Sequence, residues 1–116
     1  MVKKPEEMES ELREQMRGGK GTVEVTHLFK PGEMKGKARL FCKITLNPYC
    51  SIGTHPHDVD EEIFYMLKGR LIVDDNGVKR EFLPGEAMLT TDGDVHAVEN
   101  VTVEPAEFIA VILLRQ

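Results

Sequence analysis

Two histidines separated by one residue, His55 and His57, are the clearest sign of chemistry in this sequence. In an extended segment, side chains two residues apart share a face with Cα atoms about 6.5 to 7 Å apart, so both rings can reach one ion. Glu62 follows them, in the same parity as Phe64 and Met66 within an alternating segment. If that parity faces the interior, the Glu62 carboxylate needs a partner there.

A third imidazole, His96, lies far along the chain, at the start of another alternating segment. Any one of these residues alone is more often structural, because a single His on an apolar face is usually a core residue. Together, three imidazoles and one carboxylate suit one divalent transition metal (Mn, Fe, Co, Ni or Zn) and leave two octahedral positions for water or substrate. We therefore predict a metal site of His55, His57, Glu62 and His96. His27 is interpreted as a strand residue with no assigned role.

Short strands are the elements that must position these side chains. All but one of the Val, Ile and Thr residues lie at or after Thr22, and from Val23 onward apolar residues recur with a period of two. Turn residues such as Asn76-Gly77, the strongest hairpin signal, separate the segments. Many short strands without intervening helices predict an antiparallel sandwich or barrel. The strands are expected from Val23 and at 40–46, 63–67, 71–73, 78–82, 87–90, 96–101 and 107–114.

The N-terminal residues have a different pattern. Met8, Leu12 and Met16 recur every four residues, and two glycines follow. This spacing predicts a short helix on the outside of the barrel. The expected organisation is a helical segment at 1–21 and a single barrel domain at 22–116. The strand at 108–114 is apolar on both faces, so its outer side is expected to be covered by the N-terminal segment or by another subunit.

The composition of the chain argues against some classes of binding partner. The 116 residues carry a formal charge of −5, which argues against a nucleic-acid or anionic membrane partner. The basic residues between Lys30 and Lys43 are interpreted as a solvated loop and the strand after it. Two cysteines, Cys42 and Cys50, lack a zinc or redox spacing and are expected to be reduced, with a regulatory disulfide as the lesser alternative. The charged N-terminus has no apolar signal region, so a cytoplasmic location is expected.

The first two histidines fit a longer pattern, G-x5-H-x-H-x3-4-E-x6-G. His55, His57, Glu62 and Gly69 match it, and the spacing to Gly69 selects Glu62 over the preceding glutamate. The leading glycine is absent, since that position holds Tyr49.

A second pattern, G-x5-P-x-G-x2-H-x3-N, covers the third histidine. Gly85, Gly93, His96 and Asn100 match it, and Thr91 replaces the proline. The two patterns together resemble the motifs of the cupin family and span residues 53 to 100. The proline affects the stiffness of a turn and leaves the ligands unchanged.

The resemblance implies an all-β cupin fold, a double-stranded β-helix or jelly-roll barrel, here with the short N-terminal helix. It implies a compact, oxalate-decarboxylase-like bacterial member that binds one divalent transition metal at one mouth of the barrel. Such proteins are commonly homodimers and hold small organic acids, sugars or oxygen-chelating metabolites.

Three functions are compatible with these features. The first is a metal-dependent enzyme acting on a small anionic or chelating metabolite, of decarboxylase, dioxygenase or isomerase type. The second is a module that holds metal and metabolite without turnover, and the third is a barrel without metal. The sequence does not identify a general acid or base, because Glu62 would be occupied as a ligand. With all four ligands present, the enzyme is the favoured hypothesis and the metal-free barrel ranks last.

Overall fold

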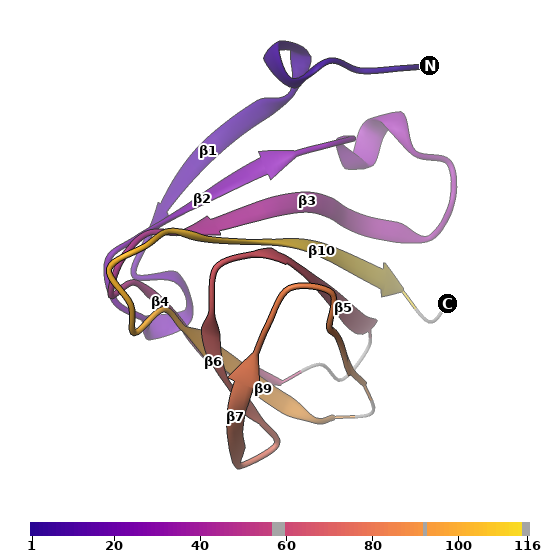
Figure 1. The fold of residues 1–116 in the computed structure, drawn as a ribbon. Helices are drawn as coiled ribbons and strands as arrows, with labels where there is room; N and C mark the ends of the chain where they lie inside the picture. Colours follow the sequence, from indigo (N-terminus) through magenta and orange to yellow (C-terminus); the bar gives the residue numbers. More distant parts are fainter. Residues whose placement is uncertain (57–59, 92, 115–116) are drawn as a thin grey trace.

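The protein consists of two antiparallel sheets (Figure 1). The structure is a computed structural model that describes residues 1–56, 60–91 and 93–114, and of residues 54–56 it describes the backbone alone. The larger sheet has six strands in the order β1-β2-β3-β10-β5-β8, and the smaller has four in the order β4-β9-β6-β7. The strands are β1 (Glu9–Glu14), β2 (Thr22–His27), β3 (Ala38–Leu46), β4 (Ser51–Pro56), β5 (Asp60–Lys68), β6 (Leu71–Asp75), β7 (Val78–Phe82), β8 (Ala87–Thr90), β9 (Val95–Glu99) and β10 (Ala106–Leu114).

Strand alternation builds the core between the two sheets, because successive side chains point to opposite faces. On β5 the parity shared by Glu62, Phe64 and Met66 is the buried one. The inner residues of β10 are buried as well, among them Phe108, which is fully buried. The sheets therefore enclose an apolar interior into which Glu62 points.

The predicted N-terminal helix is wrong. Residues Glu9–Glu14 form strand β1, which pairs with β2 from Glu9↔His27 to Glu14↔Thr22. The helical elements are three 3₁₀ turns, η1 (Pro5–Glu7), η2 (Met16–Gly18) and η3 (Pro31–Glu33), and none of the described helices is long and apolar enough to cross a membrane.

Pairing explains why a strand forms there. A single helix of this length is marginal in water unless it buries an apolar stripe, and Leu12, the centre of the expected stripe, is 69% exposed. The strand instead hydrogen-bonds to β2, which would otherwise be an edge. The N-terminal segment therefore extends the large sheet beside β2. Strands β2 and β3 separate it from β10, and it does not cover the outer face of β10.

Several tight turns have residues that tolerate a positive φ angle. Asn76 and Gly77 both have positive φ angles, 53° and 92°, between the paired strands β6 and β7. This conformation matches a tight hairpin turn, and it confirms the hairpin that Asn76-Gly77 predicts. Gly69 also has a positive φ, and a Cβ there would lie 2.7 Å from the Pro105 carbonyl oxygen. The glycine of the first sequence pattern therefore serves a close backbone approach.

Candidate metal centre

Glu62 and His96 meet in the interior of the barrel from opposite sheets. Glu62 and His96 are 5% and 2% exposed, and the Glu62 Oε1 atom lies 3.1 Å from His96 Nε2. The carboxylate comes from β5 in the large sheet, and the imidazole from β9 in the small sheet. A buried carboxylate and imidazole in contact are a donor pair that a divalent transition metal accepts.

Thr90 and Phe64 orient the His96 ring. The Thr90 Oγ1 atom lies 2.7 Å from His96 Nδ1, and Thr90 is itself fully buried opposite Glu62 in the register of β5 and β8. The Phe64 ring stacks on the imidazole with centroids 5.0 Å apart. A hydrogen bond at Nδ1 fixes the tautomer and directs Nε2, which is how ligand histidines are commonly held.

The two other predicted ligands are less fully described. The backbone of His55 lies in β4 directly opposite His96 of β9, so the register brings these two residues side by side. His57 lies outside the described residues. Among the side chains that the structure describes, Glu62 and His96 are not joined by a third His, Cys, Asp or Glu into a metal-binding group.

A cavity of about 220 Å³ opens beside Glu62. Its walls are mostly apolar, and three of the polar residues that the structure describes there, Arg13, Arg17 and His27, belong to the N-terminal hairpin of β1 and β2. The lining consists of Arg13, Met16, Arg17, Val25, His27, Pro31, Arg39, Leu40, Ile44, Ile52, Glu62, Phe64 and Ile112. An apolar pocket with a few convergent polar groups is typical of a small-molecule site.

Two of the cavity arginines are paired with acids. Arg13 Nε lies 2.5 Å from Glu11 Oε1, and Arg39 Nη2 lies 2.7 Å from Asp60 Oδ2. Asp60 is 6% exposed, so this acid is buried at the start of β5. Its partner Arg39 belongs to the basic segment, and it is the one basic residue of that segment among the described residues that line the cavity.

His27 is also part of this wall. Its Nε2 atom lies 3.1 Å from Glu11 Oε2, and its Nδ1 atom is buried with no hydrogen-bond partner among the described residues. Hydrogen bonds from Arg13, and then from His27, hold the pKa of the Glu11 carboxyl below its usual value. The sequence could not identify His27, because the cavity forms only when the N-terminal hairpin joins the sheet.

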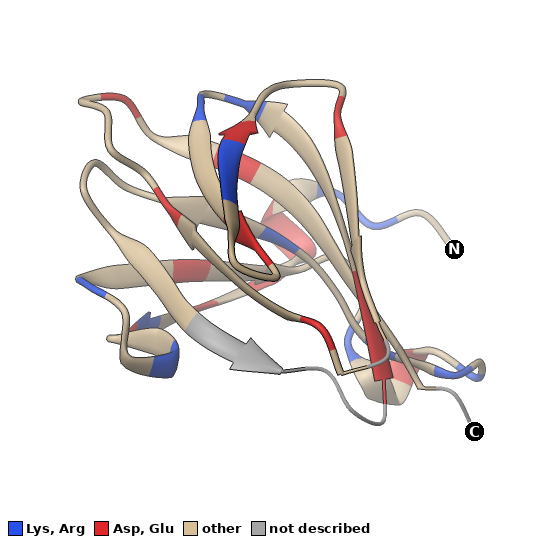
Figure 2. Ribbon diagram, turned by 90° about the horizontal axis from the view of Figure 1, so that it is seen from below, with Lys and Arg blue, Asp and Glu red and all other residues tan. Residues whose placement is uncertain are grey.

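Two lysines of the basic segment, Lys30 and Lys43, are paired with acids on other strands. Lys30 Nζ lies 2.6 Å from Glu9 Oε2, and Lys43 Nζ lies 3.8 Å from Glu107 Oε2. Figure 2 shows Lys and Arg interspersed with Asp and Glu along the described chain.

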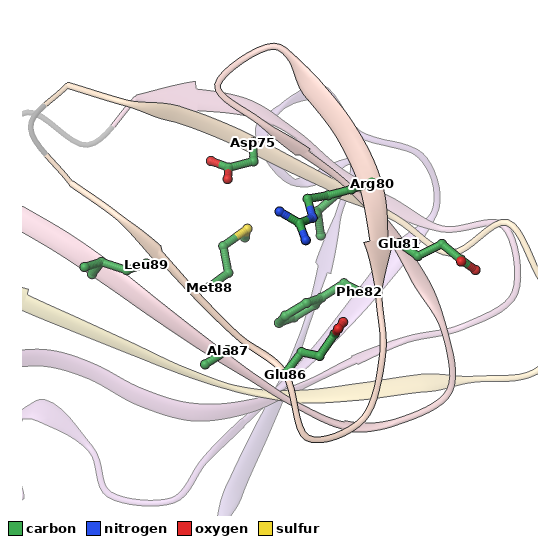
Figure 3. Close-up of a pocket in the computed structure, with 9 residues that line it drawn as sticks. Asp75, Arg80, Glu81, Phe82, Glu86, Ala87, Met88 and Leu89 are labelled. Atoms are coloured by element: carbon green, nitrogen blue, oxygen red, sulfur yellow. The ribbon is translucent and has the colours of Figure 1, made fainter.

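A second cavity of about 400 Å³ lies between β7 and β8, where the two sheets do not hydrogen-bond (Figure 3). Met88 and Phe82 form its apolar floor, and Asp75 and Arg80 are at its rim. Among the described residues that line it, neither Glu62 nor His96 is present. Because Glu62 lines the first cavity, that cavity is the candidate ligand site.

Comparisons with known proteins agree with this architecture. The profile of the cupin domain family matches residues 42–112. The oxalate-binding protein of Thermotoga maritima is 40% identical over 114 residues, which cover 98% of this chain and 94% of that protein. The crystal structure of a predicted oxalate decarboxylase from the same organism has a TM-score of 0.93 at 40% identity, covering 98% of this chain and 99% of that one. The cupin domain of a transcriptional regulator from Enterobacter cloacae, at 23% identity, covers 81% and 98% with a TM-score of 0.70 and shares the fold.

Proposed function

The chain belongs to the cupin family, and from that premise we propose that it binds one divalent transition metal and acts on a small organic acid. The observation that carries the proposal is the buried contact between Glu62 and His96, whose side chains lie 3.1 Å apart, with Glu62 on the wall of a cavity. Burying a carboxylate is costly unless charge compensates it, and a divalent cation provides that charge.

In this proposal the metal is held by His55, His57, Glu62 and His96. Once bound, the ion supplies Lewis-acid chemistry, polarising the oxygen atoms of a chelating ligand. The chain itself supplies the dry site and the fixed orientation of His96 through Thr90.

A small acid fits the cavity by size and charge. Its volume of about 220 Å³ is below the usual range for drug-sized ligands, roughly 300 to 1,000 Å³. The described residues that line it include three arginines and one histidine, which gives an acidic protein a local site for an anion. The relative from Thermotoga maritima, named as an oxalate-binding protein, favours the same ligand class.

The enzyme is the favoured form of this function, with the reaction type left among decarboxylase, dioxygenase and isomerase. His27 supports it, because this imidazole lies on the cavity wall outside the ligand set and its Nε2 contacts Glu11, an arrangement that can hold or move a proton. The second candidate is a module that holds metal and acid without turnover, which the name of the relative favours.

Metal analysis tests the ligand assignment. We expect purified untagged protein to contain about one divalent ion per chain, and Glu62→Gln and His96→Ala to bind it at least about 100-fold more weakly, since second-shell changes alone cost about 10- to 100-fold. The matched control is His27→Gln, which removes an imidazole outside the set. Near-equal metal content in all four proteins would contradict the assignment.

Turnover separates the two candidates. The metal-loaded protein is incubated with small carboxylates and diketones while oxygen uptake and carbon dioxide release are recorded. Turnover of any member supports the enzyme, whereas thermal stabilisation by an acid without turnover supports the binding module.

A further inference from the structure

Arg17 differs from the other two arginines of the cavity. Arg13 is paired with Glu11, and Arg39 with Asp60. The Arg17 side chain lines the same cavity, yet within the described part of the chain it has no hydrogen bond or ion pair. Its positive charge is therefore available to a ligand.

The backbone of Arg17 adopts a conformation that a non-glycine residue rarely takes. Its φ and ψ angles are 54° and 32°, in the left-handed region, inside turn η2. Such strain persists only where the surroundings enforce it, and it is concentrated at binding and active sites. The side chain leaves the turn from this enforced backbone position.

Contacts between backbones enforce that position. A Cβ on Gly53 would lie 1.9 Å from the Arg17 carbonyl oxygen, and one on Gly19 would lie 2.2 Å from the Ser51 carbonyl oxygen. The two segments are also bonded to each other, because Ser51 N donates to Lys20 O at 2.9 Å and Lys20 N donates to Ser51 Oγ at 2.8 Å. Turn η2 therefore packs directly on β4, the strand that carries His55.

We propose that Arg17 is the anion-binding residue of the cavity and holds a carboxylate of a small dicarboxylate ligand, whose other carboxylate lies toward Glu62 and His96. This inference rests on the proposed function, because it assigns the ligand to the same cavity. A guanidinium binds a carboxylate through two parallel N–H donors, and an arginine already paired with an acid is less available for it. The fixed turn keeps those donors at the cavity mouth before the ligand arrives.

Calorimetric titration of the metal-loaded protein with oxalate, malonate and oxamate tests the proposal. Oxamate has the shape of oxalate with a single carboxylate. We expect the wild-type protein to prefer a dianion over oxamate, and Arg17→Gln to weaken dianion binding about 10- to 100-fold and remove most of that preference. Arg17→Lys, which retains the charge without the paired donors, should fall between them.

Arg80→Gln is the matched control, since Arg80 is an exposed arginine at the rim of the other cavity. Gly19→Ala is a second test, because it displaces the turn while keeping the guanidinium, and it should also weaken dianion binding. Equal affinities for wild type, Arg17→Gln and Arg80→Gln would overturn the role of Arg17 and leave the proposed function intact. If the metal-loaded wild type binds none of the three acids, the proposed ligand class fails, and the role of Arg17 with it.

Discussion

Cys42 lies on the inner face of β3, fully buried beside the candidate site. Burial, and after it the negative charge of Glu62, raises the pKa of its thiol from about 9 to about 12. The thiol is therefore protonated at neutral pH, and it serves as a small apolar residue instead of a nucleophile.

This shift predicts a loss of stability at alkaline pH. Between about pH 9 and 12 the unfolded chain has released the Cys42 proton while the folded chain retains it, so the free energy of unfolding falls as pH rises, by at most about 1.4 kcal/mol per pH unit. Urea unfolding of wild type and Cys42→Ala at pH 8 and pH 10.5 measures it. The stability advantage of wild type should shrink at the higher pH, and a constant difference would contradict the shift.

Single residues show where sequence reasoning succeeded. Strand parity correctly grouped Glu62 with Phe64 and Met66 on one face, and the structure shows that this face is the inner one. The pairing of Asp60 with Arg39 and the place of His27 in the cavity could not be predicted, because both depend on which strands become neighbours. The contact of His96 with Glu62 also joins different sheets, and a ligand pattern was needed to connect them.

At the level of elements, Asn100 joins β9, β3 and the segment before β10. This fully buried side chain donates from Nδ2 to the carbonyl oxygens of Leu46 and Glu104, at 2.9 and 2.7 Å. Its Oδ1 accepts hydrogen bonds from the backbone N and the Oγ1 of Thr102. The last residue of the second sequence pattern therefore has a structural role, four residues after His96.

Asn100→Ala should lower the free energy of unfolding by about 3 kcal/mol, because four hydrogen bonds are lost and a buried carbonyl is left without a partner. Thr102→Val removes only the hydroxyl contacts and should cost about 1 kcal/mol. Thermal and urea unfolding measure both, with metal content as the control that should not change. Equal, small losses for the two variants would show that the network contributes little.

The N-terminal hairpin of β1 and β2 is the element that the sequence did not predict. A spacing of four residues indicated a helix, but three apolar positions among many charges do not bury enough surface to stabilise one. The strand forms because β2 provides a hydrogen-bonding edge, which is a long-range property. Interior strands such as β3 and β5 were predictable because their own alternation carries the signal.

At the scale of the whole molecule, the outer face of the large sheet is apolar where β10, β5 and β8 lie side by side. Tyr65 is 47% exposed and lies opposite Ile109 on one neighbouring strand, while Leu89, 54% exposed, lies opposite Ile63. The N-terminal segment does not cover this face. We therefore predict that a second copy of the chain packs on it, since a contiguous exposed apolar patch marks an interaction surface.

The homodimer can be tested by size-exclusion chromatography with light scattering. The wild-type protein should elute as a dimer, and the double variant Tyr65→Lys/Leu89→Lys as a folded monomer, because two buried charges would oppose the contact. Val78→Lys, an exposed position on the small sheet, should leave the dimer unchanged. A monomeric wild type, or a dimer in all three proteins, would place the interface elsewhere or remove it.

The two edge strands of the large sheet, β1 and β8, affect how copies of the protein can associate. Strand β1, at one edge, is polar at five of its six positions, and β8, at the other, has only four residues. Charged or very short edge strands resist pairing with strands of other molecules. Edge pairing can continue without limit into fibres, whereas two flat faces that meet leave no further face free. The N-terminal strand that contributes Arg13 to the candidate cavity thus also opposes edge pairing, so the predicted dimer would be a closed pair.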